Sequence, residues 1–262
     1  MKAGTSSLHT FLAHHPQIFM SELKEINYFV PGMTGNMSQS AYEEHFADAA
    51  TVQDLRMVGE SSPSYTMCTA FKGVPERIAS TLTDPRFIYV MREPIARAQS
   101  NYLHALRRDE KRPIDEALRK DYRYLDTSRY FMQASAYIDL FGRDRLLLLT
   151  AEELKSHRGE TLEKVYDFLG VDPSTTATDL PNTHDSASMR IPRPGWPTGA
   201  LDRAARAVMS EGLHTRLATT TVDPSLSDLR PDTMEWVREQ LAPDVSSLRT
   251  LMPPGFDGWG IA

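Results

Sequence analysis

The sequence predicts an α/β fold in which helices cover both faces of a central parallel sheet. Two apolar runs of strand length, at 87–91 and 146–149, carry this prediction, because strands buried on both faces lack polar alternation. Helical spacing of apolar residues marks the segments 95–106, 128–141 and 158–169. Strands that alternate with helices in this way are typical of a parallel sheet.

Length, charge and cysteine content limit the possible functions. The 262 residues suit a single domain spanning 1–262, which is long enough to bury a core without disulfides or metals. The net charge of −6 gives no general attraction to nucleic acid, so an anion site must be a local basic cluster. Cys68 is the only cysteine, so we expect no metal site and a reducing, cytoplasmic location.

Neither a membrane nor a particular assembly is indicated. No run approaches the roughly 18 apolar residues of a transmembrane helix, and the first residues lack the pattern of a signal peptide. We therefore expect no membrane partner, and the sequence carries no signal of an oligomeric state.

The remaining helices, strands and loops are predicted from residues that typically start or end such elements. A helix is expected after a hydroxyl cap at 5–7, ended by Pro16. A short strand is expected at 57–60, and Pro94 suits the first position of the helix after the 87–91 run. Gly170 should end the helix at 158–169. The polar segment 172–200 reads as a long functional loop, and 232–251 as a final amphipathic helix.

The turn at the start of the first helix is one candidate anion site. It consists of Lys2, Ala3, Gly4, Thr5, Ser6 and Ser7. Such a small, hydroxyl-rich turn exposes backbone N–H groups to an anion, and Lys2 adds a positive charge. It is not a Walker A loop, because that motif places the lysine after its second glycine. An ordinary capped helix start is the alternative that these residues alone leave open.

Two further elements carry arginine. Arg92 follows the 87–91 strand, at the end of the sheet where parallel α/β folds bind ligands, and Ser100 lies on the next helix. A guanidinium and a hydroxyl can share one phosphate. The loop 184–193 contains Ser188, Arg190 and Arg193 and could close over a nucleotide. Solvated surface residues and a plain linker are the respective alternatives.

With these three elements in this order, the chain resembles sulfotransferases that use 3′-phosphoadenosine 5′-phosphosulfate (PAPS), in their heparan-sulfate-type and bacterial branch. The resemblance covers nearly the whole chain. Its segments are KAGTSSL at 2–8, HP at 15–16, KEINYF at 24–29, GESSPSY at 59–65, REPIARAQSNY at 92–102, FLGV at 168–171 and DVSSLR at 244–249.

This resemblance implies a three-layer α/β/α P-loop-like fold and assigns roles. The 2–7 turn would hold the 5′-phosphosulfate, with Lys2 as a catalytic charge, and Arg92 with Ser100 would hold the 3′-phosphate. Ser188, Arg190 and Arg193 belong to the loop that would cover the adenosine end. Glu25 aligns with the catalytic base of this branch, and His9 is a second candidate. The implied donor is PAPS and the product is PAP (3′-phosphoadenosine 5′-phosphate), without a metal; the acceptor is a hydroxyl or amine of a small molecule or carbohydrate.

Two departures from the family pattern stand out. Relatives have a buried apolar strand just before the phosphosulfate loop, and we expect that strand to be encoded upstream of Met1. Related carbohydrate sulfotransferases often carry lysine where this chain has Ser61; Lys24, Lys72 or an arginine could supply that charge. Two other functions stay open: a catalytically impaired PAP- or PAPS-binding protein, and a P-loop kinase-like phosphotransferase. The kinase would need a Mg²⁺-binding carboxylate and a Walker A lysine, and the sequence shows neither.

Overall fold

The computed structural model describes residues 3–35, 37–106, 110–174, 190–192, 199–221 and 223–262. Its helices are α1 (Thr5–Ala13), α2 (Gln39–Glu43), α3 (Val74–Thr81), α4 (Pro94–Ala105), α5 (Ile114–Lys120), α6 (Arg123–Asp126), α7 (Tyr130–Phe141), α8 (Ala151–Ser156), α9 (Arg158–Leu169), α10 (Ala200–Val208), α11 (Glu211–Ala218) and α12 (Pro231–Arg249). Its strands are β1 (Ile18–Met20), β2 (Met57–Gly59), β3 (Phe87–Met91), β4 (Leu146–Thr150), β5 (Arg190–Pro192) and β6 (Thr219–Thr221).

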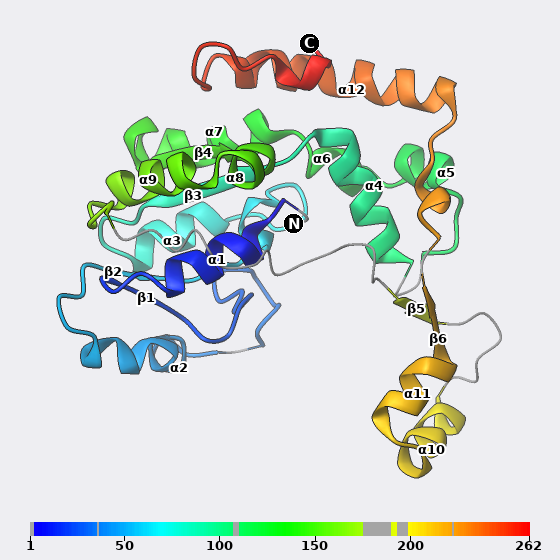
Figure 1. Ribbon diagram of the computed structural model, residues 1–262. Helices are drawn as coiled ribbons and strands as arrows, with labels where there is room; N and C mark the ends of the chain where they lie inside the picture. The colour runs from blue at the N-terminus through cyan, green and yellow to red at the C-terminus, as the bar shows by residue number, and fades with distance from the viewer. Residues whose placement is uncertain (1–2, 36, 107–109, 175–189, 193–198, 222) are drawn as a thin grey trace.

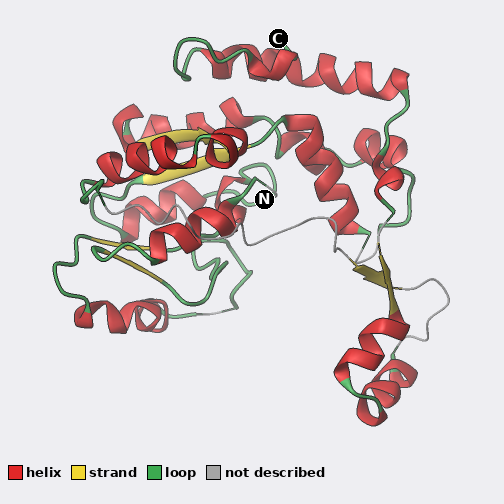
Figure 2. Cartoon of the chain, in the orientation of Figure 1, coloured by secondary structure: helices red, strands yellow, loops and turns green. Residues whose placement is uncertain are grey.

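The strands expected at 57–60, 87–91 and 146–149 are present, but in the described residues they belong to two separate parallel pairs and not to one sheet. β1 pairs in parallel with β2, and β3 pairs in parallel with β4 over five residues. Helices surround the β3–β4 pair (Figure 2), as the alternation of strands and helices predicts. The antiparallel pair β5–β6 belongs to a smaller unit that carries α10 and α11 and projects from the body of the molecule (Figure 1).

The core lies on both sides of β3 and β4. Val90 and Leu149 join a cluster with α1 and α9, whereas Tyr89 and Leu148 join a second cluster with α3 and α7. This alternation arises because successive strand residues point to opposite faces. α12 packs on α7, where the Asp244 carboxylate accepts hydrogen bonds from the first backbone N–H groups of α7. Within the described residues, no helix combines the length and apolarity of a membrane span.

Local signals position the elements that flank the site. Pro94 opens α4, and the Glu93 carboxylate accepts the N–H groups of the first turn, as a helix cap should. Thr150 at the end of β4 forms a capping box with Glu153 at the start of α8. α9 ends at Gly170, whose φ of 72° is in the left-handed region. The predictions for Pro94 and Gly170 are therefore confirmed.

The start of α1 differs from the prediction in one respect. The helix begins at Thr5, as expected, but its cap is Gly4 with a φ of 82°, and no hydroxyl side chain caps it. A residue with a side chain rarely adopts this backbone conformation, so glycine suits the turn. The Ser6 hydroxyl of the first turn instead accepts a hydrogen bond from Lys24.

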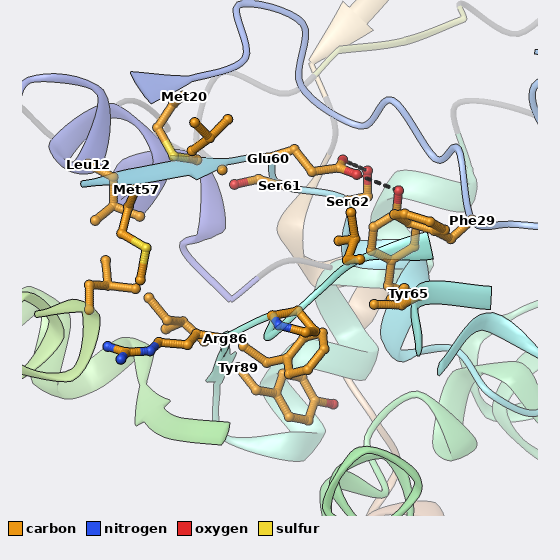
Figure 3. A pocket seen from close by; sticks show the side chains of 18 of the residues that line it. Leu12, Met20, Phe29, Met57, Glu60, Ser61, Ser62, Tyr65, Arg86 and Tyr89 are labelled. Atoms are coloured by element: carbon orange, nitrogen blue, oxygen red, sulfur yellow. Dashed lines mark hydrogen bonds between the residues drawn. The ribbon is translucent and has the colours of Figure 1, made fainter. Parts of the chain in front are cut away.

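A cavity of about 580 Å³ lies between the two parallel pairs. Its wall includes β2, the residues of β3 up to Val90, and Leu8 and Leu12 of α1 (Figure 3). In the described part of the chain, β2 pairs with β1 and β3 pairs with β4, so each pair keeps an unpaired strand edge toward this space. Exposed strand edges with an apolar surround are suited to pairing with another strand. The cavity therefore has the features of a site for one more strand.

Candidate active site

The turn before α1 forms one side of the candidate site. Ala3 is buried, Gly4 is exposed, and Thr5 and Ser6 are half-buried. The first N–H groups of a helix have no carbonyl partner within it, and a helix start of this kind can bind an anion. Of the predicted phosphosulfate loop, the structure thus describes residues 3–7, whereas Lys2 lies outside the described residues.

Lys24 and Glu25 lie beside this turn. The Lys24 ammonium donates a hydrogen bond of 2.6 Å to the Ser6 hydroxyl, although the two residues are 18 positions apart. Glu25 is exposed. Its N–H donates to the Ser61 carbonyl at 2.9 Å, and the Asn27 amide donates to its carbonyl at 2.6 Å. The predicted base therefore sits on a segment that is fixed both to the first turn of α1 and to the loop after β2.

Glu25 and Asn27 both have left-handed backbone conformations, with φ of 60° and 57°. Side-chain-bearing residues adopt this region rarely, and such residues cluster at functional sites when the surroundings hold them in place. Here the backbone N–H of Asn27 donates to the Ser62 hydroxyl at 3.0 Å. The segment 24–27 is therefore held in an unusual conformation by the loop at 60–62.

His9 is buried and partnered, unlike an accessible base. Its Nδ1 lies 3.0 Å from the Ser61 hydroxyl. Burial lowers the pKa of His9, and the charge of Lys24 lowers it further, whereas a hydrogen bond with the Ser21 backbone acts in the opposite direction. The imidazole thus joins α1 to the segments after β1 and β2. Because it is 8% exposed, it is better suited to positioning these segments than to meeting an acceptor.

The Glu60 carboxylate belongs to the loop after β2 and is directed toward Ser62 and Tyr65 (Figure 3). It accepts hydrogen bonds from the hydroxyls of Ser62 at 2.6 Å, Tyr65 at 2.6 Å and Tyr42 at 3.2 Å. Burial raises the pKa of Glu60, although these three donors act to lower it. The loop 60–62 is therefore attached to the aromatic core, and it in turn holds the backbone of Glu25.

This half-buried carboxylate should make stability depend on pH. Because the folded state raises the pKa of Glu60, the stability from its protonated form is complete below the unfolded-state pKa of about 4.3 and is lost as pH rises through the folded-state pKa. Relative to E60Q, the wild-type free energy of unfolding should fall as the pH rises above about 4.3 and through the raised folded-state pKa. Urea denaturation across this range measures the difference, with the exposed Glu163→Gln as control. A difference that does not change with pH would contradict the prediction.

The second predicted element lies beyond β3. Arg92 directly follows the strand and is half-buried, and its backbone N–H and carbonyl both contact the Tyr130 hydroxyl, at 3.4 and 2.7 Å. Ser100 lies on α4 and is 9% exposed. Between them, the fully buried Arg97 donates to the Ser128 hydroxyl at 2.6 Å and to the Tyr124 carbonyl. These contacts fix the backbone of Arg92 and the turn that leads into α4.

The third predicted element is described only in part. Ser188 and Arg193 lie outside the described residues, and Arg190 begins β5, which pairs with β6. Sequence reasoning also missed contacts that involve Lys24, His9 and Glu60. The adjacency of Lys24 to Glu25 in the chain was the available signal for the lysine. The burial of His9 and Glu60 had no comparable local signal, because their partners lie on other segments.

Comparison with known proteins identifies the family. The family model described as "Sulfotransferase domain" matches residues 1–189. Membrane-associated sulfotransferase kil1 of Dictyostelium discoideum is 29% identical over 118 residues, covering 44% of this chain and 24% of that protein. Heparan sulfate glucosamine 3-O-sulfotransferase 3B1 of Mus musculus is 26% identical over 184 residues, covering 65% of this chain and 44% of that protein. The chain thus spans less than half the length of these curated relatives.

A solved structure supports the fold. The sulfotransferase from Alicyclobacillus acidocaldarius matches with a TM-score of 0.69 at 23% identity, covering 98% of this chain and 94% of that one. This likeness confirms the predicted P-loop-like α/β fold. Because the family model extends from the turn before α1 through β4 and α9, it includes the elements that carry Glu25 and Arg92. The chain belongs to the sulfotransferase domain family.

Proposed function

We propose that the protein transfers a sulfuryl group from PAPS to a hydroxyl or amine of a carbohydrate or small-molecule acceptor. The acceptor atom attacks sulfur in line with the bond to the 5′-phosphate oxygen. That bond breaks with its electron pair going to the phosphate, which leaves as PAP, and Glu25 takes the acceptor proton. Positioning the reactants in line and stabilising the leaving phosphate are the main needs of such a transfer.

One observation carries this proposal most directly. The exposed carboxylate of Glu25 follows an ammonium, on Lys24, that is bonded to the first turn of α1. This contact supports the proposal, because sulfuryl transfer needs a base near an anion-binding group such as a helix start. Arg92 with Ser100 would take the 3′-phosphate, and Lys2 with residues 3–7 the phosphosulfate. Ser188, Arg190 and Arg193 would cover the adenosine end.

The curated relatives suggest the class of acceptor. Two of the heparan sulfate enzymes that the chain resembles act, by their names, on a glucosamine unit, and this favours a carbohydrate acceptor here. Related carbohydrate sulfotransferases often carry a lysine where this chain has Ser61. The positive charge around the acceptor should therefore be arranged differently here than in those relatives. In the structure, the Ser61 hydroxyl contacts His9. We therefore expect an acceptor less anionic than a sulfated glycosaminoglycan.

The experiment compares ligands and turnover in the full chain. PAP should raise the melting temperature more than ATP with Mg²⁺ does, because a ligand that binds the folded state stabilises it according to its affinity. Labelled PAPS should then transfer its sulfuryl group to at least one member of an acceptor panel of amino sugars, oligosaccharides and phenols. Preference for ATP with Mg²⁺ would favour a kinase, and tight PAP binding without transfer would favour a binding protein.

A further inference from the structure

The contact between Lys24 and Ser6 brings two positive features together. Lys24 places its ammonium 2.6 Å from a hydroxyl in the first turn of α1. The amino end of a helix is itself positive, so cations are normally more stable at the opposite end. The first turn of α1 contains no acidic residue that would offset this arrangement. A negative group that joined the ammonium and the helix start would therefore be stabilised by both.

The surroundings of Lys24 leave little compensation. Burial lowers the pKa of its ammonium, and the Glu25 carboxylate only partly opposes this shift. On α1, the facing titratable group is His9, whose own pKa burial and Lys24 lower. Among the described residues, Glu25 on the same segment acts on the charge of Lys24, and Lys24 in turn acts on His9 of α1. A neutral His9 avoids a second repulsion beneath the lysine.

We propose that Lys24 is a catalytic residue that binds the oxygens of the transferring sulfuryl group at the start of α1. This assignment rests on the proposed function. During the reaction, the bond from sulfur to the acceptor atom forms and the bond from sulfur to the 5′-phosphate oxygen breaks. Lys24 keeps its proton throughout, while Glu25 takes the proton of the acceptor. A fixed charge directed at the reacting group lowers the barrier without reorganisation.

Because position 61 is a serine, the positive charge at this site has to come from another segment, and Lys24 is placed to supply it. The short side chain of Ser61 is occupied by His9 at 3.0 Å, so residue 61 supplies no charge. The charge of Lys24 lowers the pKa of the same imidazole. The Lys24 ammonium extends from the segment after β1 to the first turn of α1, where its hydrogen bond to Ser6 fixes its position. Lys24 would therefore act on the sulfuryl group, whereas Ser6 is a positioning residue.

The test distinguishes a catalytic role of Lys24 from a structural role in which it only links its segment to α1. K24M should lower kcat by about 10²–10³-fold, the usual effect of losing one such stabilising group. Because PAP lacks the sulfuryl group, K24M should leave the Kd for PAP within about threefold of the wild type. K24R should retain most activity. Because arginine stays charged, K24R should also move the alkaline limb of the kcat/KM profile to higher pH. The exposed Lys164→Met is the matched control and should behave as wild type.

Three results would overturn the assignment. K24M could keep wild-type kcat, or it could lose PAP affinity and melting temperature together with kcat, which would make Lys24 a structural tether. An alkaline limb that K24R leaves unmoved would likewise count against it. In each case, a wild-type chain that still binds PAP and consumes PAPS keeps the proposed function intact. A wild-type chain that does neither would sink the proposed function itself.

Discussion

Replacing Glu25 by Gln should lower kcat by about 10²–10⁴-fold, the contribution that a positioned base makes to a proton transfer. The expected loss arises because the amide cannot take the acceptor proton as the bond to sulfur forms. The backbone contacts of residue 25, with the Ser61 carbonyl and the Asn27 amide, do not involve its side chain. The melting temperature and the Kd for PAP should therefore stay close to those of the wild type.

The control for Glu25 lies on the same segment. Glu22 is also exposed and carries the same charge, so E22Q tests whether charge alone near the site matters. Initial rates with saturating PAPS and acceptor measure both variants. If E25Q and E22Q had equal rates, or if E25Q lost PAP affinity, Glu25 would not be the base. A surviving rate in E25Q would direct attention to another group that contacts the acceptor.

Adding an apolar strand ahead of the turn at residues 3–4 should raise stability strongly. The cavity between β2 and β3 has an apolar lining, and Val58 on β2 is 49% exposed beside it. Each Val or Ile that a strand buries there contributes about 1.5–3 kcal/mol, against roughly 1–2 kcal/mol for ordering its backbone. Bonds to two strand edges add about 1 kcal/mol each. A five-residue strand, the length of β3, should give a clear net gain.

Thermal unfolding of extended chains measures this gain. An extension with five Val and Ile residues and a short polar lead should raise the melting temperature, by about 2–4 °C for each kcal/mol gained. A Gly and Ser extension of equal length is the control. Equal melting temperatures for the two extensions would show that the cavity does not take a strand.

Local sequence signals predicted most of the fold. The apolar runs that became β3 and β4 and the glycine that ends α9 were found because each signal lies within the element it marks. β1 was missed because three residues, Ile18–Met20, are too few to show a period. The expected hydroxyl cap of α1 was wrong, since Gly4 with its positive φ occupies that position.

The candidate site was predictable only in its separate pieces. The resemblance named Glu25 and Arg92, and the end of β3 placed Arg92 where parallel sheets bind ligands. The bond between Lys24 and Ser6 joins segments from different elements, so no local pattern contains it. The same is true of the bond between His9 and Ser61. Residues that hold a site together across the chain emerge only from the folded arrangement.

The most direct measurement compares the affinities of PAP and AMP in the wild type and in R92A. AMP lacks the 3′-phosphate, and hydrogen bonds to charged groups contribute about 1.5–3 kcal/mol, so wild-type protein should bind PAP at least about tenfold more tightly than AMP. R92A should lose most of this preference while keeping its AMP affinity. R86A, at the exposed amino end of the same strand, should keep it. An unchanged preference in R92A would contradict a bisphosphorylated nucleotide bridging the α1 turn and the end of β3.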